Sequence, residues 1–284
     1  MRKKFSPPVL IVFIFLLVIL SGTLLLMLPF STKNGISFID ALFTETSAVC
    51  VTGLIVKNTG QDFTFFGQLI LLISIQLGGL GIMTISTFFY QLIKRDLSLR
   101  HQLVIRELVA PKGDFFDIVN LSVKVITYTV IFEAFGAFFF CLKFIPLYGW
   151  GKGLFYSIFH SVSSFCNAGF STFVDSFSAF SDSPLVLLTS STLFIFGGLG
   201  FLILYELFEL NIFNKGLNIR MKKFSVQTKL MLLGTVVLLA GGTIAMFFLE
   251  KDNTLSSMGF FEKILVSFFH SATARTAGFN VIDL

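Results

Sequence analysis

Three stretches of the chain share one pattern of residues that could bind a cation through the backbone. They read FTETSAVCVTG at 43–53, FHSVSSFCNAG at 159–169 and FHSATARTAG at 269–278. Each begins with Phe, continues through Ser- or Thr-rich positions and ends at a glycine. Backbone carbonyls of an extended loop can replace the water around a dehydrating ion, and glycine permits backbone angles that a side chain forbids.

The three terminal glycines place these stretches in an internal repeat. Gly53, Gly169 and Gly278 are 116 and 109 residues apart, a period near 110. Three unrelated glycine turns would not share the upstream Phe and the Ser- or Thr-rich run, so we interpret the stretches as equivalent loops. Their candidate ion-binding residues are Val51, Thr52, Gly53, Asn167, Ala168, Gly169, Thr276, Ala277 and Gly278.

The composition places the chain in a lipid bilayer. Hydrophobic residues make up 55% of it, charged residues 13%, and the mean hydropathy is +0.87. A soluble domain carries about a quarter charged residues. The three cysteines lie in apolar surroundings and are too few for a disulfide framework, and no Cys or His spacing indicates a metal site.

The length of the apolar runs predicts which segments cross the bilayer. Crossing takes about 20 residues, and five runs are long enough: 9–28, 64–93, 117–142, 184–210 and 229–249. Three shorter segments, 37–47, 153–164 and 260–272, are expected to enter and return as half-helices. The chain is therefore predicted to be an all-α integral membrane protein of repeated helix, pore half-helix, filter loop and helix units, with two complete repeats and most of a third.

The expected organisation follows from these segments. The predicted units are repeat 1 at 1–93 with its half-helix and filter at 37–53, a basic loop at 94–116, repeat 2 at 117–210 with its half-helix and filter at 153–169, a basic loop at 211–228, and a partial repeat 3 at 229–284 with its half-helix and filter at 260–278. The second spans of repeats 1 and 2 share the clusters GGLGI and GGLGF, which we interpret as helix-packing sites.

The distribution of basic residues predicts the orientation. Thirteen of the 21 Lys and Arg residues lie in the N-terminal tail, in the first basic loop or in and just after the second. The positive-inside rule places these segments, and the N-terminus, in the cytoplasm. All three filter loops then open outside. The basic loops also suit contact with lipid headgroups.

The segments SAVCVTGL, SSFCNAGF and ARTAGFN resemble the filters of the Trk/Ktr/HKT superfamily of potassium transporters, in particular the membrane subunit of the bacterial Ktr system. The resemblance implies potassium uptake across the inner (cytoplasmic) membrane by a multi-pass protein, with sodium as a second ion. It implies four linked units around one pore, and two such subunits paired in the membrane. It also implies gating by a cytoplasmic nucleotide-binding subunit. Nothing indicates a nucleic-acid partner.

The chain departs from this superfamily at its C-terminal end, six residues after Gly278. The resemblance implies a second helix for repeat 3, which carries a gate loop in Ktr relatives, and a fourth repeat. We therefore expect the 284-residue chain not to conduct by itself. Two alternatives stay open: a non-conducting fragment, and a membrane-embedded enzyme, which ranks last because no acid, base and nucleophile cluster together.

Four further polar residues have a structural and a functional interpretation. His160 and His270 directly follow the repeat Phe, and we expect packing and hydrogen bonding from them, not metal binding. Glu133 lies in the middle of a span, where an ionisable group is a functional candidate, and we expect it to brace the pore. Arg275 would repel a cation, so its side chain is expected to point away from the ion path, toward half-helix carbonyls or a carboxylate.

Overall fold

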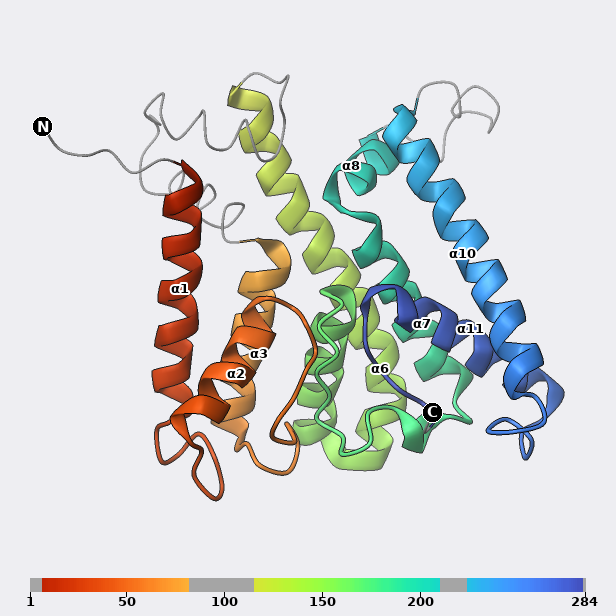
Figure 1. Cartoon of the computed structure of the whole chain (residues 1–284), viewed down its shortest axis with the longest axis horizontal. Coiled ribbons are helices and arrows are strands. Elements are labelled where there is room, and N and C mark those ends of the chain that lie inside the picture. The colour runs from red at the N-terminus through yellow and green to blue at the C-terminus, as the bar shows by residue number, and fades with distance from the viewer. Residues whose placement is uncertain (1–6, 82–114, 210–223, 283–284) are drawn as a thin grey trace, which may run out of the picture.

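The computed structural model describes residues 7–81, 115–209 and 224–282. Its helices are α1 (Pro7–Leu26), α2 (Phe38–Val49), α3 (Phe65–Leu80), α6 (Phe115–Phe165), α7 (Pro184–Leu199), α8 (Phe201–Glu209), α10 (Val226–Glu250) and α11 (Phe260–Thr276). The described residues form no regular strand, only an isolated bridge between Thr32 and Phe63. Figure 1 shows long helices around the short α2 and α11.

Polar caps mark where several helices begin. Ser37 precedes α2 and its hydroxyl accepts a hydrogen bond from the backbone N–H of Asp40 at 3.1 Å. Thr64 and Ser225 cap α3 and α10 in the same way. Such caps satisfy backbone donors that have no partner inside the helix. In this apolar chain, the polar capping residues mark where a new helix begins.

Glycine breaks two of the predicted spans. The span expected over 184–210 is two helices, α7 and α8, separated at Gly200 with φ +88°. Within the span expected over 64–93, helix α3 ends at Leu80, before Gly81 with φ +74°, and residues 82–93 lie outside the described part. Positive φ is cheap for glycine alone. The GGLG clusters therefore end helices as well as packing them, which the sequence interpretation missed.

The second repeat joins a long helix to its half-helix. Helix α6 continues past the predicted end at 142 and is broken at Gly149, where φ is +79° and ψ is +169°. After that break the chain reverses and the half-helix runs to Phe165. The chain direction thus turns at Gly149 with no separate loop.

Several helices expose long apolar faces on the outside of the described structure. Along α10, Leu230, Leu233, Val236 and Leu249 are each more than 60% exposed. Two stretches within the described residues, Val123–Phe165 and Val226–Glu250, are long and apolar enough to cross a membrane. A soluble protein rarely leaves such a continuous apolar surface open to water.

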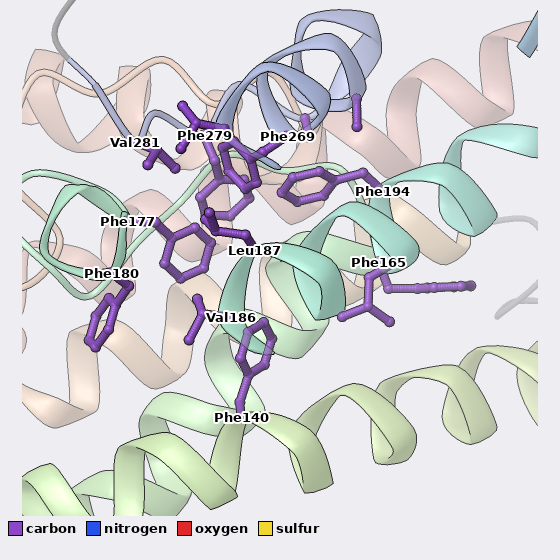
Figure 2. Close-up of a cluster of buried hydrophobic side chains, with 14 of the residues drawn as sticks. Phe140, Phe165, Phe177, Phe180, Val186, Leu187, Phe194, Phe269, Phe279 and Val281 are labelled. Atoms are coloured by element: carbon purple, nitrogen blue, oxygen red, sulfur yellow. The ribbon is translucent and has the colours of Figure 1, made fainter. Parts of the chain in front are cut away.

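The buried side chains form two main clusters on either side of the half-helix of repeat 2. The first joins α6, α7 and α11 and is dominated by phenylalanine, including Phe140, Phe177, Phe194 and Phe279 (Figure 2). The second joins α1, α2 and α3 to the half-helix of repeat 2 and contains Leu71 and Phe159. The half-helices are thus held between the long helices.

Candidate functional site

The three repeat glycines meet at one place in the molecule. Gly53, Gly169 and Gly278 have φ values of +79°, +72° and +73°. A Cβ atom on Gly53 would lie 3.3 Å from the Cα of Gly169, and one on Gly169 would lie 3.7 Å from the Cα of Gly278. The three loops therefore bring equivalent backbone positions together, although they are far apart in the sequence.

Carbonyl oxygens line the contacts between neighbouring loops. A Cβ on Gly53 would be 2.9 Å from the carbonyl oxygen of Ala168, and one on Gly169 would be 2.8 Å from that of Ala277. These spacings leave no room for a side chain. Gly53 and Gly169 thus each pack on the carbonyl that precedes the glycine of the next repeat.

The first two half-helices end in the same hydrogen-bonded turn. The N–H groups of Val51 and Thr52 donate to the carbonyls of Ala48 and Ser47 at 3.2 and 2.9 Å. In repeat 2, Asn167 and Ala168 make the equivalent bonds. This pair of bonds is the Schellman motif, which needs a left-handed residue after the helix. Val51 and Asn167 supply it, with φ values of +56° and +57°.

Valine is an uncommon choice for that conformation. A β-branched residue with positive φ is strained, by about 1–3 kcal/mol, whereas asparagine adopts the left-handed region more readily. The first loop therefore adopts a backbone conformation that the intrinsic preference of Val51 disfavours. Such strain persists only where the surrounding contacts fix the backbone.

The third loop brings its glycine to the same place with a different backbone conformation. It is one residue shorter between Phe and Gly, and α11 stays helical through Thr276, with no left-handed residue before Gly278. The N–H groups of Ala277 and Gly278 both donate to the carbonyl of Thr273, at 2.9 and 3.3 Å. The three loops are therefore only approximately equivalent in backbone conformation.

Hydroxyl groups fasten each loop to its own half-helix. Ser163 donates to the carbonyl of Phe170 at 2.7 Å. Thr273, at the equivalent position, donates to the carbonyl of Phe279 at 3.0 Å and accepts its N–H at 2.8 Å. In repeat 1 the bond joins the hydroxyls of Thr52 and Ser47 at 3.0 Å. The Ser- and Thr-rich runs signalled this role, which the sequence analysis did not assign.

The glycine clusters of α3 and α7 pack against the half-helix ends. A Cβ on Gly78 would overlap the carbonyl oxygen of Val49, and one on Gly79 would overlap the sulfur of Cys166. On α7, a Cβ on Gly197 would overlap the carbonyl oxygen of Phe165. Each second helix therefore touches its own half-helix at close range, and α3 also touches the next one, in keeping with the packing interpretation.

The other polar candidates lie behind the loops. The ring of His160 stacks on Phe173 at 4.4 Å, donates from Nδ1 to the carbonyl of Tyr156 at 2.7 Å and contacts the hydroxyl of Ser171 at 3.0 Å. No group of three or more His, Cys, Asp or Glu side chains in the described parts could hold a metal ion. His160 thus has the packing and hydrogen-bonding role that we expected.

Two charged residues flank the site without entering it. Glu133 on α6 interacts with Gln76 on α3, and its Oε1 lies 4.0 Å from the sulfur of Cys166. Arg275 is half-buried, and its Nη2 would lie 3.9 Å from a Cβ on Gly198 of α7. No ion pair of Arg275 is found within the described ranges, so the carboxylate partner considered for it is not among them.

Comparison with known proteins identifies the family. The family model described as "TrkH: Cation transport protein" matches residues 6–284. The chain belongs to the TrkH family of cation transport proteins. This is a family of membrane transport proteins and not of enzymes, which removes the membrane-embedded enzyme from the alternatives.

Individual TrkH relatives cover nearly the whole chain. The Ktr system potassium uptake protein B of Vibrio alginolyticus is 41% identical over 100% of the chain, and that of Bacillus subtilis is 38% identical over 99%. The potassium/sodium uptake protein NtpJ of Enterococcus hirae is 39% identical over 99%. The chain spans 61% of the length of each of these relatives.

A solved structure shows the same fold. The crystal structure of the potassium transporter TrkH from Vibrio parahaemolyticus matches with a TM-score of 0.65 at 19% identity, over 99% of this chain and 53% of that one. The likeness supports the all-α membrane architecture predicted from the sequence.

Proposed function

We propose that this chain contributes the selectivity filter of a potassium uptake system. The observation that carries the proposal is the meeting of three glycines with positive φ, each at the end of a half-helix. The proposed ion-binding residues are Val51, Thr52, Gly53, Asn167, Ala168, Gly169, Thr276, Ala277 and Gly278.

The chemistry of the loops suits a cation. Carbonyl oxygens replace the ion's water, and the C-terminal ends of α2 and α11, which carry partial negative charge, face the loops. The relatives from Vibrio and Bacillus are named potassium uptake proteins, and NtpJ is named for potassium and sodium. Potassium is therefore the proposed substrate, with sodium as a second ion.

The proposed surroundings are the inner (cytoplasmic) membrane, with the N-terminus in the cytoplasm and a second copy of the subunit beside the first. The starts of α1, α6 and α10 lie at one end of the molecule (top of Figure 1), which supports placing the basic segments together on one side. These segments lie outside the described residues. The Ktr names support a cytoplasmic regulatory partner, proposed to bind nucleotides.

The partner is tested by neutralising basic residues. Replacing Arg100, Arg106, Lys222 and Lys223, all outside the described part, with Gln should weaken co-purification of a cytoplasmic regulator while ion preference stays unchanged. Full retention of the regulator would mean that these charges serve topology alone.

The substrate is tested by uptake in cells that lack their own potassium transport. Expressing the transporter, in the assembly that the cell makes, should restore growth at low potassium. Gly169→Ala should abolish the rescue, because the new Cβ would press on the carbonyl of Ala277. Gly35→Ala is the matched control, since Gly35 also has positive φ (+76°) but nothing within 4 Å of a Cβ. Equal rescue by both variants would refute the proposed filter.

A further inference from the structure

The three repeats share a contact between the first helix and the half-helix, and one repeat departs from it. In each repeat, a glycine on the first helix faces the residue two positions after the repeat Phe, and a Cβ on that glycine would overlap this residue's side chain. The pairs are Gly22 with Glu45, Gly136 with Ser161, and Gly242 with Ser271. A carboxyl group thus stands in repeat 1 where the other repeats have serine.

The serines make one kind of bond. Ser161 donates to the carbonyl of Glu133 at 2.6 Å, and Ser271 donates to the carbonyl of Leu239 at 3.0 Å. Both acceptors lie on the first helix of the same repeat, three residues before the facing glycine. In repeats 2 and 3 the half-helix is therefore tied to the first helix.

Glu45 makes a different bond. Its Oε1 accepts a short hydrogen bond from the hydroxyl of Ser74 on α3. The position on α7 that matches Ser74, counted from the glycine clusters, is Leu193, which offers no polar group. Of the two repeats whose second helix the structure describes, repeat 1 has this tie between its half-helix and its second helix and repeat 2 does not.

Glu45 is fully buried, and its carboxyl group is only partly hydrogen-bonded. Glu45 has 0% exposure, and its Oε2 has no hydrogen-bond partner among the described residues. Burying a carboxyl group that is only partly hydrogen-bonded costs free energy. Serine fills the same position in repeats 2 and 3 without that cost, so packing alone does not explain the carboxyl group.

The bond lies directly behind the first filter loop. Two residues after Glu45, the carbonyl of Ser47 accepts the N–H of Thr52 at 2.9 Å, in the turn that leads to Gly53. On α3, four residues after Ser74, Gly78 packs on the carbonyl of Val49. A shift of α2 against α3 would therefore move the carbonyls next to Gly53.

We propose that Glu45 is a positioning residue for the first filter loop and, through the Ser74 bond, for its preference between ions. This inference rests on the proposed ion filter. A loop held at a fixed spacing disfavours a smaller ion, because its carbonyls cannot close around it. Loosening α2 from α3 removes that restraint, so the preference for potassium over sodium falls.

The test compares three variants in the transporter as the cell assembles it. Glu45→Ser installs the residue of the other repeats, and Ser74→Ala removes the donor. Both should lower the potassium-to-sodium ratio in competitive uptake, per amount of membrane protein, roughly threefold to tenfold, the range expected for one hydrogen bond. Glu45→Gln keeps an acceptor oxygen in the same place and should retain a ratio within about twofold of wild type.

Thr192→Ala is the matched control, because it removes a hydroxyl from α7 whose one partner among the described residues is the carbonyl of Leu188 in its own helix. Its ratio should be unchanged. An unchanged ratio in both Glu45→Ser and Ser74→Ala would overturn the proposal. So would an equal loss in Glu45→Gln and Glu45→Ser, because the hydrogen bond would then not be the cause.

A second readout separates this inference from the proposed function. The thermal unfolding of the purified protein is measured for Glu45→Ser, Ser74→Ala and the double variant. A direct bond predicts that the double variant loses less than the sum of the single losses. Absence of potassium uptake by the wild type would refute the proposed function, whereas additive losses would refute the bond between Glu45 and Ser74.

Discussion

The second helices of the first two repeats each pack between two filter loops, but they do so with different side chains. Helix α3 lies between the first and second filter loops, and its Ser74 and Gln76 contact the carboxyl groups of Glu45 and Glu133. Helix α7 lies between the second and third loops. Its Phe194 packs on Phe269 and Phe279, with ring centroids 5.6 and 5.3 Å apart (Figure 2).

This comparison distinguishes two features of each interface: the close approach of the second helix to a half-helix, and the side-chain contacts that hold the two together. Both helices carry a glycine, Gly78 or Gly197, that admits a half-helix carbonyl at close range. The attachment around that glycine is directional and polar on α3, but aromatic on α7. Since lipid gives helices little hydrophobic reason to associate, the two interfaces need these contacts, and they should respond differently to mutation.

The largest effect is expected at the aromatic interface. Phe194→Ala should lower the free energy of unfolding by about 3–5 kcal/mol, because a fully buried ring leaves a cavity. Unfolding of the purified protein in detergent measures it. Phe248→Ala, at an exposed ring on α10, is the control. A similar small loss in both would show that the aromatic cluster does not hold α7.

A smaller loss is expected where glycine meets a backbone carbonyl. Gly78→Ala and Gly197→Ala should each cost about 1–3 kcal/mol by overpacking, and they should do so equally, because the spacing rule is common to both helices. Gly234→Ala on α10, where nothing lies within 4 Å of a Cβ, should be neutral or slightly stabilising. The yield of folded protein and its unfolding temperature are measured for all three variants. Tolerance of alanine at Gly197 alone would show that the two interfaces differ in spacing as well.

The smallest effect is expected at a side-chain hydrogen bond that joins the second and third loops. The hydroxyl of Thr276 donates to Oδ1 of Asn167 at 2.7 Å. Thr276→Val should cost about 0.5–1.5 kcal/mol, the net value of a typical hydrogen bond, while Thr276→Ser should keep it. If Thr276→Ser and Thr276→Val unfold alike, the bond contributes nothing to stability.

The sequence was informative where one residue type has one physical role. The positive φ of Gly53, Gly169 and Gly278 follows from their place at the end of a short helix, and the third loop is shorter as its letters show. The half-helices could be placed because they are too short to cross a bilayer. Whether the nine proposed residues bind ions stays a prediction.

Other features depend on contacts that the sequence does not display. The breaks at Gly81 and Gly200 lie inside apolar runs that are long enough for a straight span, so length favoured continuous helices. Glu45 replaces the serine of the other two repeats, but its role depends on its burial against α1 and its bond with Ser74, which the sequence does not display. Val51 gives no signal for positive φ, because its conformation is imposed by the turn that follows α2.

The central claim is tested most directly by Gly53→Ser. A side chain at φ +79° costs about 1–3 kcal/mol of strain and would press on the carbonyl of Ala168. Competitive uptake of potassium and sodium, per amount of membrane protein, is compared with that of Gly35→Ser, where φ is a similar +76° and nothing lies within 4 Å of a Cβ. We predict that Gly53→Ser lowers the preference for potassium more than it lowers protein abundance, while Gly35→Ser changes neither. Wild-type uptake and preference in Gly53→Ser would mean that Gly53 is not part of a filter.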